Sequence, residues 1–126
     1  MKALTIKQPW ATLIMQGDKR FEFRSWQTKY KGDLLIHAGK GIDKEAMNRF
    51  KYLNLDYPQG MIIAKCNMTD CLLVDNSLKE QLKEKDPIVY KGAINSNKQE
   101  YAFKLNQIKR TNPSLWRKLI QKLKFR

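Results

Sequence analysis

Three charged side chains that could bind or turn over a ligand, Lys19, Glu22 and Arg24, lie close together along the chain. Glu22 and Arg24 alternate with aromatic residues, a pattern typical of a β-strand, which places Phe21 and Phe23 on the core face and the two charged residues on the opposite face, with Lys19 at the entry of the strand. Lysine and arginine can hold phosphate, and a glutamate can accept a hydrogen bond from a base amine or take up a proton. The alternative is a structural ion pair on a solvated strand face.

Two tryptophans and a glutamine could complement this charged cluster. Stacking of a base on an aromatic side chain contributes about 1–3 kcal/mol. Trp26 lies on the charged face of the strand, which favours contact with a ligand. Trp10 lies in the apolar stripe of a short helix, so it either stacks on a base or packs in the core. Gln8 immediately precedes that helix and could either read a base edge or cap the helix.

Further basic residues and one histidine extend the candidate site. Lys29 and Lys31 flank a tyrosine in a turn, and Lys40 lies between two glycines after a strand; each could contact a phosphate. His37 ends an apolar strand and is either a packed structural residue or a cleft residue. One histidine and two cysteines offer no metal-ligand spacing, so we expect no metal and no cofactor.

The net charge is the strongest compositional feature. The chain carries 25 basic and 12 acidic residues, a formal net charge of +13, and residues 98–126 alone hold 9 of the basic and 1 of the acidic groups. An anionic partner would relieve this self-repulsion, so we expect nucleic acid, with single-stranded RNA favoured over DNA and an acidic protein as the alternative. No apolar run approaches a membrane span and no signal peptide is evident, so we expect a cytoplasmic monomer without integral membrane association.

Strand and helix patterns alternate along the 126 residues, a length that suits one compact domain. Besides the charged strand, the patterns predict strands over 2–7, 33–38, 61–74 and 101–105, and helices over 9–16, from Asp43, over 77–85 and from Asn112. We therefore predict an α+β fold, with a small β-barrel of five or six strands and short helices over 1–110.

The last segment, 111–126, is predicted to form a basic amphipathic helix packed on the barrel. Its apolar stripe would dock on the barrel and leave Arg117, Lys118 and Lys122 facing outward. Three roles remain open for this basic face: an electrostatic clamp on nucleic acid, a membrane-surface helix, or a solvated face without a partner.

Several ordered motifs resemble the ASCH domain (activating signal cointegrator homology), a family of the PUA-like superfamily of small β-barrels. They are LTIKQPWA at 4–11, GDKRFEFRSW at 17–26, GDLLIHA at 32–38, the strand from Gly60 to Asp70-Cys71, and YAFKL at 101–105. The resemblance covers roughly residues 2–108. It implies a cleft lined by the start of the first helix and the two strands that follow, and an association with RNA or DNA binding, with ribonuclease activity in some bacterial members.

One branch of this family looks like an amidohydrolase for acetylated cytidine, which uses a lysine, a threonine nucleophile three residues later and a distant glutamate. Lys19 matches the lysine, but Glu22 stands where the threonine would be, and a carboxylate cannot replace that nucleophile. The leading hypothesis is therefore a nucleic-acid-binding domain that uses a basic cleft and the basic C-terminal helix. The alternatives are a metal-independent ribonuclease or modified-nucleobase hydrolase, with Lys19 as electrostatic stabiliser and Glu22 as general base, and a protein-interaction module in transcriptional regulation.

Overall fold

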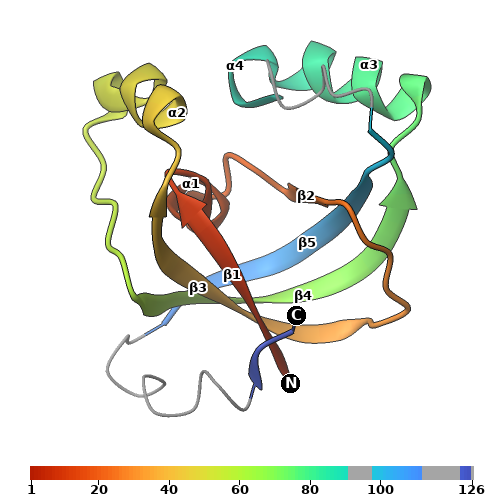
Figure 1. Ribbon diagram of the computed structural model, residues 1–126, viewed down its shortest axis with the longest axis horizontal. Coiled ribbons are helices and arrows are strands. Elements are labelled where there is room, and N and C mark those ends of the chain that lie inside the picture. The colour runs from red at the N-terminus through yellow and green to blue at the C-terminus, as the bar shows by residue number, and fades with distance from the viewer. Residues whose placement is uncertain (91–97, 112–122, 126) are drawn as a thin grey trace.

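A computed structural model describes residues 1–90, 98–111 and 123–125, which form a curled, half-open β-sheet with short helices around it (Figure 1). The strands lie in the order β1-β3-β4-β5-β2; β1 is parallel to β3, and the other neighbouring pairs are antiparallel. Their bounds are β1 Lys2–Gln8, β2 Phe21–Arg24, β3 Gly32–Ile42, β4 Met61–Leu73 and β5 Tyr101–Arg110. Within this sheet β1 and β2 are the two edges, so the half-barrel is open between them.

Short helices fill and cover this half-barrel. They are α1 Trp10–Gln16, α2 Lys44–Arg49, the 3-10 helix η1 Lys51–Leu53, α3 Asn76–Lys85 and α4 Pro87–Tyr90. Helix α1 packs against β1, β3, β4 and β5, and its Ile14 joins the main core with Leu4, Ile36 and Phe103. A second apolar cluster, which includes Leu13 of α1, lies beneath α2, α3 and α4.

The end of α1 delivers the charged segment to the opening of the half-barrel. Gly17 has φ +88°, a left-handed conformation that a side chain disfavours, and the N–H groups of Asp18 and Lys19 both donate to the carbonyl of Leu13. The chain therefore reverses after Gly17 and enters β2 at Phe21, two residues after Lys19.

The predicted α+β fold and its five strands are confirmed, with three differences in detail. Strand β3 does not end at Ala38 but continues through the glycine-flanked Lys40 to Ile42, because the register opens into a bulge rather than a turn. Strand β5 extends to Arg110, beyond its apolar residues. The single-turn helix α4 was not predicted, because four residues are too few for a periodic signal.

The predicted C-terminal helix lies mostly outside the described residues. Residues 123–125, which are described, lie along the free edge of β1, where the N–H of Phe125 donates to the carbonyl of Ala3 at 2.7 Å. The Phe125 ring packs on Trp26 and Tyr30, with centroids 5.1 and 5.4 Å away. No helix among the described residues is long and apolar enough to cross a membrane.

Candidate functional site

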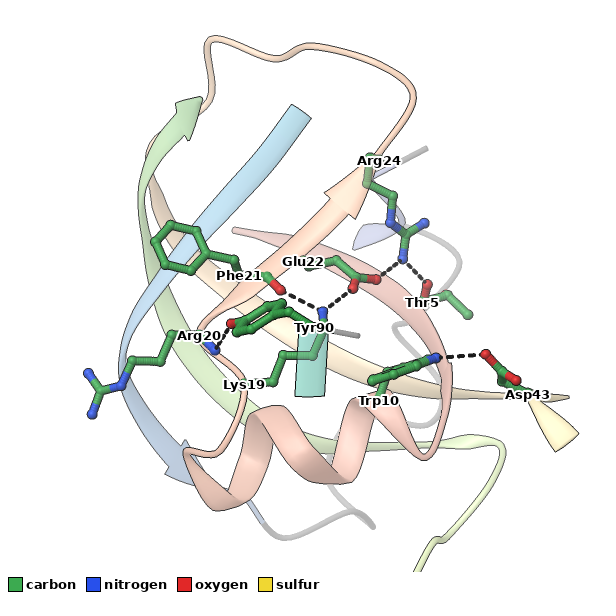
Figure 2. Close-up of polar contacts among 9 residues, drawn as sticks. All are labelled: Thr5, Trp10, Lys19, Arg20, Phe21, Glu22, Arg24, Asp43 and Tyr90. Carbon is green, nitrogen blue, oxygen red and sulfur yellow. Dashed lines mark hydrogen bonds and ion pairs between the residues drawn. The ribbon is translucent and has the colours of Figure 1, made fainter. Parts of the chain in front are cut away.

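Lys19, Glu22 and Arg24 form a buried ionic triad at the opening between the two edge strands (Figure 2). The Nζ of Lys19 lies 2.7 Å from Oε1 of Glu22, and Nη2 of Arg24 lies 2.9 Å from Oε2. Lys19 is only 2% exposed and Glu22 only 8%. Since buried charges require partners, each charge of the triad depends on the others.

Arg24 also joins the two edges of the sheet. Its Nη2 donates to the backbone carbonyl of Thr5 on β1 at 2.7 Å, although Arg24 itself lies on β2, at the other edge (Figure 2). The Nζ of Lys19 donates to the carbonyl of Phe21, at the start of β2 itself. The triad therefore bridges the gap that backbone pairing leaves open.

Glu22 is held in its ionised form by this arrangement. Burial by itself raises the pKa of Glu22, but the charges of Lys19 and Arg24, together with the hydrogen bonds they donate, outweigh burial and leave the pKa below its ordinary value of 4.5. A carboxylate in this state accepts hydrogen bonds and does not readily take up a proton near neutral pH.

A cleft of about 720 Å³ lies beside the triad. Its walls come from β1, β2, the end of β3, the start of α2 and residues 98–100, with Trp10 and Phe23 among the lining side chains. Six basic and four acidic residues line it: Lys7, Lys19, Arg24, Lys40, Arg49 and Lys98 against Glu22, Asp43, Glu45 and Glu100.

The indole of Trp10 is held firmly in the cleft wall. Its Nε1 donates to Oδ2 of Asp43 at 3.2 Å, and the other oxygen of Asp43 caps helix α2 (Figure 2). The edge of Phe50 packs against the ring at 5.8 Å, and the cationic groups of Lys19 and Arg49 each lie 5.7 Å from its centroid. The Trp10 ring therefore already has an aromatic and two cationic partners within the protein, although it also lines the cleft.

The amino-acid sequence of this chain matches one family model over most of its length. The family model described as "ASCH domain" matches residues 4–114. The chain belongs to the ASCH domain family. The expected resemblance is thereby confirmed.

Relatives and solved structures agree with this assignment. Activating signal cointegrator 1 of Homo sapiens is 33% identical over 138 residues, and that of Mus musculus is 32% identical over 132 residues. Both alignments cover 90% of this chain but only 22% of the relative, so the chain spans about a fifth of the length of these proteins. The crystal structure of ASCH from Zymomonas mobilis superposes with a TM-score of 0.61 at 16% identity, over 88% of this chain and 70% of that one, which shows the shared fold.

The structure of this ASCH domain corrects the predicted faces of β2. Glu22 points inward and is buried, whereas Phe21 and Phe23 are only partly buried and pack in the second cluster; the ring of Phe23 meets Tyr90 edge-on at 5.8 Å. The ion pair of the alternative is present, but the face that carries it is not solvated, because the curled sheet and α1 enclose the charged side and α3 and α4 cover the aromatic side.

Gln8 is held inside the protein and does not line the cleft. It is fully buried; its Oε1 accepts from the N–H of Thr12 at 3.0 Å, and its Nε2 donates to the carbonyl of Pro58 at 2.7 Å. The capping alternative describes this contact, because Thr12 lies in the first turn of α1 and its N–H has no partner within the helix.

Four other predicted site residues lie away from the cleft. Trp26 is partly buried and packs edge-on against Phe103 at 5.0 Å, on the margin of the main core and outside the lining of the cleft. His37 pairs its Nδ1 with Oγ1 of Thr5 at 3.1 Å, and burial together with the nearby Lys124 lowers its pKa. The remaining two, Lys29 and Lys31, are exposed on the connection between β2 and β3 and do not line the cleft.

The last three predicted contacts, Arg117, Lys118 and Lys122, lie outside the described residues. Conversely, the cleft contains residues that were not predicted to belong to the site, above all Lys7 and Asp43. The only available signal for Lys7 was its place beside Gln8 in the first motif, and nothing along the chain indicates that it lies opposite the end of β3.

Proposed function

We propose that this ASCH domain binds nucleic acid in the cleft between β1 and β2, with single-stranded RNA preferred over DNA. The observation that carries the proposal is the basic lining of the cleft, six cations against four acids, in a chain of net charge +13. Basic side chains that neutralise phosphates release condensed counterions, and this release supplies most of the affinity in sequence-tolerant binding.

The dimensions of the cleft favour an unpaired strand. A volume of about 720 Å³ enclosed by three strands and a helix admits individual nucleotides. A protein recognises a duplex by inserting a protruding helix or β-ribbon into the groove of the nucleic acid. A single strand instead lies in a basic groove of the protein. RNA is generally recognised at such unpaired positions.

Binding accounts for the triad better than hydrolysis does. A general base works best when its pKa lies near the pH of the reaction, and the pKa of Glu22 is lowered well away from neutrality. Both carboxylate oxygens of Glu22 already accept hydrogen bonds from Lys19 and Arg24. To act as a general base in the hydrolase alternative, Glu22 would have to break its hydrogen bond to Lys19 or Arg24.

Fluorescence anisotropy with labelled single-stranded RNA, single-stranded DNA and duplex DNA over a salt series tests the proposal. We expect tightest binding to RNA, and affinity that falls with salt at a log–log slope of about −0.7 for each phosphate contacted. The same mixtures on a denaturing gel should contain intact RNA. Cleavage that disappears in a Glu22→Gln variant shown by circular dichroism to be folded would establish the hydrolase instead, and absence of binding at low salt would leave an acidic protein as the partner.

A bulky substitution tests whether the cleft is the binding site. Ser25 is exposed and lines the cleft, so Ser25→Trp should obstruct it without changing the charge. Ser77→Trp is the matched control, because Ser77 is exposed on α3 and does not line the cleft. Equal affinities of the two variants would refute the assignment to the cleft.

A further inference from the structure

Five of the six basic residues of the cleft fall into two groups. Lys19 and Arg24 are paired with Glu22, and Arg49 lies 3.4 Å from the carboxylate of Glu45. Lys7 and Lys40, in contrast, are exposed, and neither forms an ion pair within the part of the chain that the structure describes. The first group is neutralised by the protein itself, whereas the second group is not.

Three of the four acids in the cleft are already occupied. Glu22 accepts from both cations of the triad, Asp43 accepts from Trp10 and from the N–H of Ala46, and Glu45 pairs with a cation one helical turn away. These three acids therefore do not draw Lys7, on β1, or Lys40, on β3, away from a ligand.

A local irregularity of the sheet presents these two lysines. Ile6 pairs with Ala38 and Gln8 pairs with Ile42, so Lys7 alone faces the three residues 39–41. The methylene chain of Lys7 lies over Gly41: a β-carbon there would come within 3.4 to 3.7 Å of three of its carbons. A side chain at position 41 would compete for the space that Lys7 uses.

The backbone of the bulge is held in place from the opposite side. Nε2 of Gln59 donates to the carbonyl of Lys40 at 2.8 Å, and the N–H of Gly60 donates to the carbonyl of Ala38 at 2.7 Å. Lys40 therefore extends from a fixed strand rather than from the flexible turn that the glycine-rich sequence predicts.

We propose that Lys7 and Lys40 form the phosphate-binding part of the cleft, and that Lys19, Glu22 and Arg24 are positioning residues that hold its walls. This inference rests on the proposed nucleic-acid binding and assigns its contacts. Ammonium groups bind phosphate as point charges and lack the planar fork with which arginine makes bidentate contacts. Since the ring of Trp10 is already in contact with two cations of the protein, backbone contacts should dominate, and binding should tolerate any base sequence.

The test compares two double variants of equal charge in the anisotropy assay with single-stranded RNA. In Lys7→Ala/Lys40→Ala we expect about a tenfold weaker affinity at low salt and a salt slope shallower by about 1.4, because two phosphate contacts are lost. Lys29→Ala/Lys31→Ala is the control, since these lysines are exposed but outside the cleft, and it should keep nearly the wild-type slope. Far-ultraviolet circular dichroism should show that both variants remain folded.

The outcomes separate this inference from the proposed function. If wild type binds RNA but the two double variants bind equally well, the phosphate assignment is overturned while nucleic-acid binding stands. If wild type binds no oligonucleotide at low salt, the proposed function fails and this assignment fails with it. An RNA with abasic positions should compete within a few-fold of the intact strand; loss of competition would show that bases, not phosphates, are recognised.

Discussion

Replacement of Glu22 by glutamine is the most direct test of how the buried triad works. The substitution keeps the size of the side chain but removes the one negative charge that Lys19 and Arg24 share. The Lys19 ammonium would then be buried without a counter-ion, because its side chain is only 3% exposed. Arg24 would suffer less, since its side chain is 25% exposed and keeps the carbonyl of Thr5.

The expected cost follows from this difference in burial. Removal of one partner from a buried ion pair typically destabilises a protein by about 3–5 kcal/mol, because it leaves an uncompensated charge. We expect Glu22→Gln to fall in that range, a large fraction of the roughly 5–15 kcal/mol that stabilises a domain of this kind. The additional change Lys19→Met should recover part of the loss, because the apolar chain can pack between Trp10 and Phe23 without a charge.

Urea denaturation at several pH values measures this effect. Because the folded pKa of Glu22 is lowered below 4.5, its contribution is fully present above that pH and is lost as the pH falls through the folded pKa. The difference in the free energy of unfolding between wild type and Glu22→Gln should therefore be constant from pH 7 to about 5 and shrink at lower pH.

Glu45→Gln supplies the matched control for this experiment. Glu45 also lines the cleft and pairs with Arg49, but its side chain is 84% exposed, and an exposed pair contributes at most about 1 kcal/mol. If Glu22→Gln costs no more than Glu45→Gln, or if Lys19→Met restores nothing, the triad does not stabilise the fold as argued.

Two further substitutions, each with a control, test contacts of β1. Gly39→Ala should lower the free energy of unfolding by about 1–3 kcal/mol, because its β-carbon would lie 2.8 Å from Cγ2 of Thr5. Gly41→Ala is the control and should cost less, since only the flexible chain of Lys7 lies near it. Equal urea midpoints for the two variants would contradict this. Phe125→Ala should cost about 2 kcal/mol through lost aromatic packing on the edge of β1, with Lys124→Ala as the exposed control. An unchanged midpoint for Phe125→Ala would show that residues 123–125 do not dock on β1 in solution.

Much of the fold could be predicted from the sequence because its signals are local. Alternation in β1 and β4, the helical spacing of α1 and the glycine that ends it each depend on neighbouring residues. Strand β3 was predicted too short, because the glycines flanking Lys40 are as typical of a turn as of a bulge, and only the partner strand decides between them.

The candidate site was predicted only in part, for the same physical reason. Glu22 and Arg24 stand out because they alternate with Phe21 and Phe23, and Lys19 because it stands at the entry of this strand. Alternation separates two faces of a strand, but it does not say which face the rest of the chain covers. Burial of the charged face depends on the curl of the whole sheet around α1.

The sequence by itself determined the family, the order of most strands and helices, the strong positive charge and the presence of a charged cluster after α1. Only the tertiary structure decided which cations are neutralised within the protein and which remain for a ligand. Arg24 reaches Thr5 across the two edges of the sheet, and Lys7 lies over Gly41, because β1 pairs with the distant β3. Contacts of this kind join residues far apart along the chain, so their pairing depends on register and sheet curvature, which no local pattern of residues encodes.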